Sequence, residues 1–399
     1  MVMRLLAAED REAHSRLMAE AFGGGRRPAP SAEPAAPAEA TAPESPTLGI
    51  FDGPRLVAAA TTHDLHVTWG AHDAPMGGVA GVACVADQRG RGHVNRLLAE
   101  SLRLMRDRGQ YLSGLYPFAW AFYRRHGWDW VGEKRVYTVP TSELQRSAEN
   151  WYLRCYDGPE AQEMVRPVYD TFARRYRSMA TRLDASPNFW EGALKHQDNR
   201  TTYVHVYRNP ESGAVEGYLT FRYPSEGDAG KVDELVAITP AGYRGMLAAL
   251  HCYGTQVKKV EFSAPADDIL PLHVMHWDVE TKVRPSFMGR IVDVPAAFAA
   301  LQPDIAHSGS VILRVADGQC DWNNGTFALT IEGGRVAVAV SDQAPGIEID
   351  IQTLTQAYWG QPSLALLRTA GRLAVTDEAQ YATLLRLLPP TVCYIQDFF

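Results

Sequence analysis

Long apolar runs are missing from this chain of 399 residues. No stretch approaches the ~18 consecutive apolar residues that a membrane-spanning helix requires. Near the start, charge appears at Arg4 and Glu9, before the apolar core of a secretory signal could form. We therefore predict neither a membrane span nor a secretory signal. The apolar fraction of 46% and the charged fraction of 21% are those of a globular chain.

Cysteine is also sparse. Five cysteines are present, an odd number, and no two form a Cys-x-x-Cys pair, which disfavours a disulfide framework and a zinc site. His63 and His66 lie three apart on a predicted strand and therefore face opposite sides. His273 and His276 have no third ligand nearby in the sequence. We predict a reduced, cytoplasmic protein without a metal site.

Positive charge is outnumbered, with 39 basic against 46 acidic residues and a net charge of −7. This balance disfavours a general nucleic-acid binder. Residues 291–399 contain five arginines, no lysine and eleven acidic residues, so this last quarter has a net charge of −6. The region either attracts a cationic small substrate or is a soluble acidic surface, and composition leaves both open.

The chain is too long for one ordinary core, and its pattern divides into three units. Residues 1–145 predict the order β-α-β-β-β-α-β-α-β, interrupted at 26–47 by an insert with six prolines and seven alanines. Such an insert is expected to be flexible or extended. The fold class is a mixture of α+β and α/β.

The second unit, residues 146–290, repeats the order of the first and suggests a diverged internal duplication. It is predicted to contain a helix over 158–179, a strand over 232–238 and a helix that begins at Pro240. The third unit spans residues 291–399. Apolar and polar residues alternate in the segments on both sides of Gly333-Gly334, and this pattern predicts a hairpin. Its remaining segments predict a small α+β domain with one layer of helices.

The most informative segment is Gln88-Arg89-Gly90-Arg91-Gly92, between a predicted strand and a predicted helix. Glycines at such a junction let backbone N–H groups converge beside the positive helix N-terminus, which makes a cradle for phosphate. Arg89, Arg91 and Arg96 add positive charge suited to a pyrophosphate. The segment has neither the lysine of a P-loop nor the third glycine of a dinucleotide fingerprint.

This segment resembles the Q/R-x-x-G-x-G/A signature of GNAT acetyltransferases, and the segment from Phe122 to Trp128 is similar to their FYxxxGF segment. Pro117 is expected to start the helix that carries it. The whole chain resembles the Eis (enhanced intracellular survival) acetyltransferases: two GNAT-type domains, the second degenerate, and a C-terminal sterol-carrier-like α+β domain. The resemblance implies acetyl transfer from acetyl-CoA to amines of aminoglycosides, polyamines or protein lysines, and a homohexamer.

The resemblance also implies a site. The strand edge that pairs with the pantetheine arm corresponds to Ala83, Cys84 and Val85. The residues that match the pyrophosphate loop are Arg91, Gly92, His93, Val94, Asn95 and Arg96, and those beside the thiol are Phe118 and Ala119. In the middle unit, the segment from Thr239 to Gly245 has no such cradle, and Pro240 lacks a donor. We predict that the middle unit does not bind acetyl-CoA tightly.

Two residues match catalytic groups of the family. Tyr123 matches the general acid, and a phenol with a pKa of about 10 is protonated at pH 7 and can donate to a leaving thiolate. The alternative is a tyrosine that only packs its helix. Phe399 matches the terminal carboxylate, which would bind a cationic amine and orient a water. The alternative is an apolar anchor, with both terminal phenylalanines docked.

Two rival functions stay open at this point. The chain could be a lipid- or ligand-binding protein that acts through its sterol-carrier-like unit, or a sensor that binds acetyl-CoA without turnover. Tyr123 and the glycine cradle favour an enzyme. The natural acceptor amine is not identified by the sequence.

Overall fold

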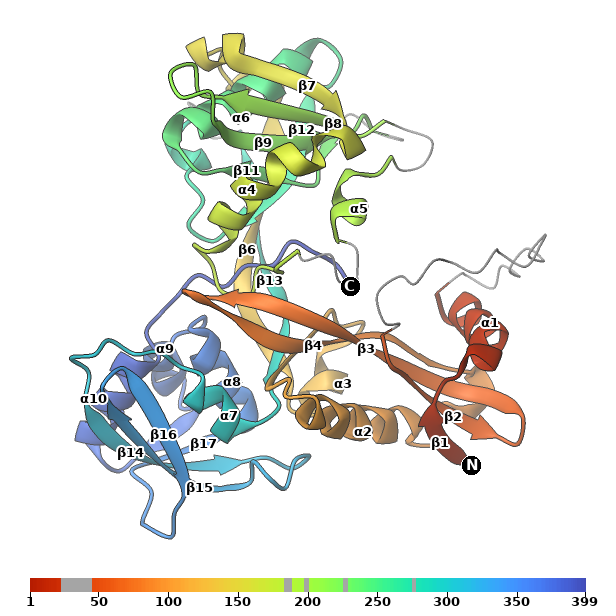
Figure 1. Ribbon diagram of the computed structural model, residues 1–399, viewed down its shortest axis with the longest axis vertical. Coiled ribbons are helices and arrows are strands. Elements are labelled where there is room, and N and C mark those ends of the chain that lie inside the picture. The colour runs from red at the N-terminus through yellow and green to blue at the C-terminus, as the bar shows by residue number, and fades with distance from the viewer. Residues whose placement is uncertain (23–44, 183–188, 197–200, 225–228, 275–277) are drawn as a thin grey trace.

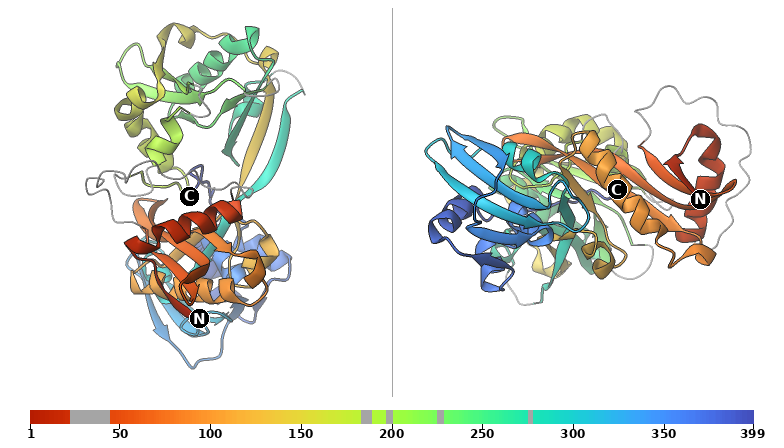
Figure 2. Two further views of the ribbon diagram at one scale, coloured as in Figure 1. Left: turned by 90° about the vertical axis from the view of Figure 1, so that its right-hand side faces the viewer. Right: turned by 90° about the horizontal axis from the view of Figure 1, so that it is seen from below.

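The computed structural model describes residues 1–22, 45–182, 189–196, 201–224, 229–274 and 278–399. Most of the insert expected at 26–47, and His276, lie outside these ranges. The described chain forms three units, and the C-terminus lies between the middle unit and strands β3 and β4 (Figures 1 and 2). No helix in the described ranges is long and apolar enough to cross a membrane.

The first unit is a twisted sheet with helices on its faces. Its strands are β1 (Val2–Leu5), β2 (Thr47–Asp52), β3 (Arg55–Trp69), β4 (His72–Cys84), β5 (Leu112–Leu115) and β6 (Asp129–Pro140). Its helices are α1 (Arg11–Phe22), α2 (His93–Asp107) and α3 (Trp120–Arg124). Strands β1 to β4 pair antiparallel, and β4 then pairs parallel with β5. Leu97, Leu98, Leu102 and Met105 form the buried stripe of α2, as helical spacing predicts.

The middle unit has its own four-stranded sheet, with the order β11-β9-β8-β7. The four strands of this sheet are β7 (Leu153–Asp157), β8 (Tyr203–Arg208), β9 (Val215–Phe221) and β11 (Leu235–Ala237). The unit also contains β10 (Ala229–Val232), β12 (Lys259–Pro265) and β13 (Glu280–Ile291), which belong to a second sheet. Its helices are α4 (Gln162–Ala173), α5 (Phe189–Leu194) and α6 (Pro240–Cys252).

Two long strands join the first and middle units (Figure 1). Strand β13 inserts between β5 and β6, so the sheet order is β1-β2-β3-β4-β5-β13-β6-β12-β10. The last six residues of β13, from Ser286 to Ile291, are all buried, whereas its first six are exposed. A single nine-stranded sheet therefore runs through both units.

The third unit packs directly on the first. Its strands are β14 (Gly309–Ala316), β15 (Gly325–Glu332), β16 (Arg335–Val340), β17 (Ile347–Asp350) and β18 (Leu373–Val375). Its helices are α7 (Val294–Ala299), α8 (Ile351–Trp359), α9 (Leu364–Thr369) and α10 (Glu378–Leu387). Trp359 of α8 lies edge-on to Trp69 of β3, with ring centroids 5.3 Å apart, inside one continuous apolar core. The hairpin predicted at Gly333-Gly334 joins β15 to β16.

Three predicted elements were wrong in extent. The strand expected over 232–238 is two strands in different sheets, because Asp233 and Glu234 interrupt it and Glu234 turns inward. The helix expected over 158–179 ends at Ala173, and Ser178 has a φ of 73° where the chain turns to meet β3. The helix expected to start at Pro117 begins at Trp120.

Candidate active site

Strands β4 and β5 separate at one point, and this separation creates the site. They pair from Met76 to Val79 of β4, and the pairing then stops. Gly81 has a φ of +56°, in the left-handed region that favours glycine, where the register with β3 shifts. From Ala80 to Cys84 the outer edge of β4 faces no strand of the described chain. Such an edge can form hydrogen bonds with an amide-bearing arm.

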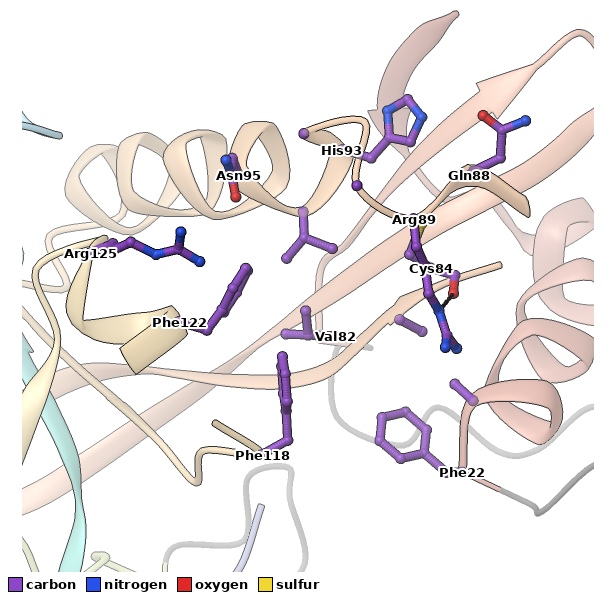
Figure 3. A pocket seen from close by; sticks show the side chains of 15 residues that line it. Phe22, Val82, Cys84, Gln88, Arg89, His93, Asn95, Phe118, Phe122 and Arg125 are labelled. Atoms are coloured by element: carbon purple, nitrogen blue, oxygen red, sulfur yellow. Dashed lines mark hydrogen bonds between the residues drawn. The ribbon is translucent and has the colours of Figure 1, made fainter. Parts of the chain in front are cut away.

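A pocket of about 790 Å³ lies along this edge, between β4, the start of α2, the end of α1 and α3 (Figure 3). Several residues predicted from the sequence line it: Ala83, Cys84, Gly92, His93, Val94, Asn95 and Phe118. Gln88, Arg89 and Gly90 of the predicted phosphate cradle also line it. The remaining lining residues had not been assigned to the co-substrate: Ala21, Phe22, Val82, Phe122 and Arg125. Val85, Arg91, Arg96 and Ala119 do not line it.

The N-terminus of α2 opens into this pocket. Gly90 and Gly92 have φ values of +77° and +78°, and a Cβ at either would meet open space. Gly92 is the N-cap and offers no side-chain oxygen, so no side chain caps the first N–H groups of the helix. Positive charge comes from Arg89, whose Nε donates to the Cys84 carbonyl at 3.2 Å, and from Arg125. The arrangement suits an anion at a helix N-terminus.

Two arginines of the predicted loop lie elsewhere. Arg91 and Arg96 are exposed, so they can contribute only at the rim. His93 is 5% exposed, and neither ring nitrogen has a hydrogen-bond partner among the described residues. Figure 3 shows its ring and the Gln88 side chain on the side of the loop away from Phe118. The His93 side chain therefore supports the loop from behind.

Tyr123 lies on α3 behind the aromatic wall of the pocket. It is 3% exposed, and its ring packs edge-on to Phe118 and Phe122, with centroids 5.4 and 5.2 Å away. Its hydroxyl makes no hydrogen bond with any residue that the structure describes. Burial raises the pKa of Tyr123 to about 12, so the phenol is protonated across the neutral range.

Arg290 of β13 fixes the end of α3. Its Nη1 donates to the His126 carbonyl at 2.7 Å, and its Nη2 pairs with Asp317 of the third unit at 2.7 Å. A Cβ at Gly127 would lie 1.2 Å from Nη1, so only glycine leaves room for this guanidinium. Both Arg290 and Asp317 are buried. No local sequence pattern indicates this support, because the three elements are far apart in the chain.

The C-terminus lies beside the point at which strands β4 and β5 begin to separate. The Phe399 ring fills the space beside Gly78, where a Cβ would come within 2.8 Å of it, one residue before β4 and β5 separate. It is 5.4 Å from the Tyr116 ring and 6.5 Å from the His63 ring, centroid to centroid. The expectation that both terminal rings dock in an apolar site was wrong for Phe398, whose ring lies against Tyr116 at 4.7 Å but is 76% exposed.

His63 belongs to this end of the site, although the sequence raised it only as a metal ligand. Its Nδ1 lies 2.8 Å from the Ser45 hydroxyl, and burial lowers its pKa, so the ring is neutral at pH 7. Among the described residues, no three histidine, cysteine or acidic side chains come together as metal ligands.

Comparisons with known proteins agree with this geometry. Residues 2–131 and 182–291 each match an acetyltransferase (GNAT) domain, and residues 294–396 match a sterol carrier protein domain. The chain is 26% identical to an uncharacterized N-acetyltransferase of Streptomyces avermitilis over 353 residues, covering 83% of each chain. A second relative, from Streptomyces griseus, is 26% identical over 366 residues, or 86% of each chain.

Two solved structures share the fold over their whole length. Eis1 from Mycobacterium abscessus has a TM-score of 0.80 at 21% identity, and a GCN5-related N-acetyltransferase from Anabaena variabilis has 0.85 at 18%, each covering 100% of both chains. The fold and the site thus define a GNAT-type transferase. The chain belongs to the GNAT N-acetyltransferases, with two GNAT domains and a C-terminal sterol carrier protein domain. The resemblance to Eis proteins is confirmed in domain composition and fold.

Proposed function

We propose that this protein transfers the acetyl group of acetyl-CoA to a primary amine of a cationic acceptor: an aminoglycoside-like compound, a polyamine or a lysine. One observation carries the proposal. The uncapped N-terminus of α2 and the free edge of β4 form one pocket, and the chain terminus lies where β4 and β5 separate. GNAT enzymes as a family use acetyl-CoA. The cytoplasmic location and the hexamer stay sequence-based predictions.

The residues present fit acetyl-CoA in three respects. The first turn of α2, with Gly90, Gly92 and Arg89, offers N–H groups and positive charge for a pyrophosphate. The outer edge of Ala83 and Cys84 offers backbone groups for the amides of a pantetheine arm. The aromatic wall around Phe118 then leads toward Tyr123. The thioester would therefore lie between the free edge of β4 and α3.

The proton steps follow from the charges. The amine nitrogen must lose its proton before it attacks the thioester carbon. The carboxylate of Phe399, with a free-acid pKa near ~3.5, is ionised and a weak base, so it binds the ammonium and orients a water that accepts the proton. The C–N bond then forms and the nitrogen releases its second proton to solvent water, while the C–S bond breaks and the sulfur leaves as a thiolate. Tyr123 donates its proton to that sulfur and is reprotonated from solvent.

The raised pKa of Tyr123 is compatible with this role. Desolvation raises the pKa of Tyr123 to about 12 and also raises the pKa of the Cys84 thiol, which lines the same pocket. A leaving thiolate in these surroundings experiences the same penalty, so its proton affinity rises together with that of the phenol. The difference in pKa between donor and acceptor is therefore smaller than the rise in the pKa of Tyr123 alone would make it.

The rival functions receive less support. The side chains of the third unit pack with those of the first into one core, in which Trp359 and Tyr358 contact Trp69. This packing favours a structural part of the enzyme over an independent lipid carrier. A sensor without turnover would not require the chain end, whose Phe399 ring lies beside Gly78, at this site.

Release of free thiol from acetyl-CoA with a panel of polyamines, aminoglycosides and lysine peptides tests the proposal, with mass spectrometry of the products. We expect turnover with at least one cationic amine. A three-residue extension beyond Phe399 should keep acetyl-CoA binding and lose most turnover, whereas the same extension at the N-terminus should keep both. Full activity in the C-terminally extended variant would remove the carboxylate from the mechanism. Binding of a lipid without turnover of any amine would overturn the proposal.

A further inference from the structure

Three charged side chains are buried together behind the C-terminal tail. Arg182, Glu234 and Asp397 are 3%, 4% and 6% exposed. Arg182 Nη2 lies 2.7 Å from Asp397 Oδ1, and its Nε lies 3.1 Å from the same oxygen. The guanidinium also pairs with both carboxylate oxygens of Glu234. Asp397 is thus held two residues before the chain ends.

Neutral groups of the middle unit complete this cluster. The Tyr169 hydroxyl donates to Asp397 Oδ2 at 2.9 Å, and the Tyr218 hydroxyl donates to Glu234 Oε2 at 2.7 Å. The Arg182 guanidinium lies over the Tyr169 ring, 3.9 Å from its centroid. Apart from Asp397, these charged and aromatic groups come from the middle unit. Desolvation raises the pKa of Asp397, against the opposing effect of Arg182.

The first unit holds the same residue from the other side. The Tyr116 hydroxyl donates to the Asp397 carbonyl at 2.7 Å. The Tyr116 ring also lies 4.7 and 5.4 Å from the rings of Phe398 and Phe399. Asp397, two residues before the chain ends, is therefore fixed by its side chain to one unit and by its backbone to another.

Stability alone gives little reason for such a cluster. Burying charges costs so much desolvation that well-packed apolar side chains would often be as stable, whereas removal of one partner leaves an uncompensated charge. An ionic cluster does fix geometry, because each hydrogen bond has a direction. The residue that it fixes lies beside the reactive end of the proposed site.

We propose that Asp397 and Arg182 are positioning residues for the reaction: they hold the C-terminal carboxylate in place over β4. The inference rests on the proposed role of Phe399. It also gives the middle unit a part in the reaction, because Arg182, Glu234 and Tyr169 belong to the unit without a phosphate cradle.

Trimming by carboxypeptidase A, which removes exposed C-terminal aromatic residues, reports the position of the tail directly. The intact protein is followed by mass spectrometry as it loses Phe399. Asp397→Asn should lose Phe399 at least ~10-fold faster than the unchanged chain, because the tail opens locally once its buried partner is lost. The matched control is Asp233→Asn, which removes the neighbouring half-exposed carboxylate that pairs with Arg222 and does not contact the tail.

A milder pair of variants serves if Asp397→Asn does not fold. Tyr116→Phe removes the hydroxyl that donates to the Asp397 carbonyl and keeps the ring. Its control is Tyr394→Phe, which removes a hydroxyl of the same tail that donates to the Ser263 carbonyl at 3.4 Å. We expect faster trimming in Tyr116→Phe and unchanged trimming in the control.

Kinetics separate a positioning role from a structural one. Asp397→Asn should lower kcat at least ~10-fold, because misplacement of a reacting group by about 1 Å can cost that much or more. The KM for acetyl-CoA should stay within twofold of its original value. Trimming at the original rate would overturn the positioning role. Faster trimming with full turnover would support the anchoring of the tail and contradict the proposed role of the Phe399 carboxylate.

Discussion

The two GNAT domains of this chain differ at the same strand-to-helix junction: the helix N-terminus is uncapped in the first domain and capped in the middle domain. In the first domain, α2 begins at an uncapped glycine, Gly92, and opens into a pocket. In the middle domain, the Thr239 side chain caps α6 by accepting from the Gly242 N–H at 3.0 Å. A Cβ at Gly242 would lie 2.4 Å from the Glu216 carbonyl, so the backbone there is already in close contact.

The difference lies in charge as well as in space. The Thr239 hydroxyl donates to Glu216 Oε2 at 2.7 Å, which places a carboxylate beside the N-terminus of α6. Acidic side chains favour that position of a helix, but one already there repels a phosphate. The middle domain thus has the GNAT fold with a side-chain cap and a carboxylate at the helix N-terminus, and we predict that it does not bind acetyl-CoA. What the middle domain supplies instead is the ionic cluster around Arg182.

The largest difference that we expect between the domains is the effect on kcat of removing one buried tyrosine hydroxyl from each. Tyr123→Phe should lower kcat by about 10²-fold and leave acetyl-CoA affinity unchanged, because general-acid catalysis is typically of that size. Tyr243→Phe in α6 removes a hydroxyl that donates to Asp268 at 3.0 Å, yet should keep kcat within twofold. Steady-state kinetics and calorimetry measure both. An equal loss of kcat in both variants would show that Tyr123 has no catalytic role that Tyr243 lacks.

Low pH should act on the middle domain through His205. Its Nε2 lies 2.7 Å from the Tyr253 hydroxyl, and burial lowers its pKa from 6.5 to about 4. As the pH falls below about 6.5, His205 becomes protonated in the unfolded chain but stays neutral in the folded chain. The free energy of unfolding therefore decreases between pH 6.5 and 4. This one site should cost about 2 kcal/mol between pH 7 and 5.

Urea unfolding of the unchanged protein and of His205→Gln at pH 7 and pH 5 measures that contribution. The variant should lose less of its free energy of unfolding over this range. An identical pH dependence in both proteins would show that His205 is not the group responsible.

The glycine cradle offers the next comparison. Gly92→Asp should weaken acetyl-CoA binding at least ~10-fold, because a carboxylate near phosphate costs a kcal/mol or more. Gly92→Ala has the same strained φ of +78° without the charge and so measures the part due to backbone strain. Ala241→Asp places an acid in the first turn of α6 and should leave the affinity unchanged. Calorimetry that finds Gly92→Asp equal to the unchanged protein would refute the cradle.

The smallest effect tests the cap of α6. Thr239→Ala removes the oxygen that caps this helix and should lower the free energy of unfolding by about 1 kcal/mol. It should leave acetyl-CoA binding and turnover unchanged, because we predict that the middle domain takes no part in binding the co-substrate. A second acetyl-CoA site in this variant would mean that the cap alone had closed the junction.

Local patterns predicted the elements that depend on neighbouring residues. The spacing of Leu97, Leu98 and Leu102 fixed the face of α2, and the two glycines before it marked the cradle. Local patterns wrongly predicted that the Phe398 ring is buried, because the burial of a terminal ring depends on which distant residues cover it. Arg91 and Arg96 were expected to hold the pyrophosphate, but Arg91 lies in the loop and Arg96 in the first turn of α2, both exposed and outside the pocket lining, because side-chain directions follow from tertiary packing.

Contacts between distant segments had no local signal. Asp397 and Arg182 are 215 positions apart, and Arg290 and Asp317 join a strand of one unit to a loop of another. The insertion of β13 between β5 and β6 also escaped prediction, because half of that strand is exposed and charged. These contacts position α3 and the tail, so the sequence indicated residues that line the pocket more readily than the groups that orient α3 and the tail.

Calorimetric titration of the intact chain with acetyl-CoA tests the central claim, that one GNAT domain binds the co-substrate and the other does not. We predict one acetyl-CoA per chain, because the uncapped N-terminus of α2 opens into a pocket and that of α6 is closed by Thr239 and Glu216. A stoichiometry of two acetyl-CoA per chain would contradict it.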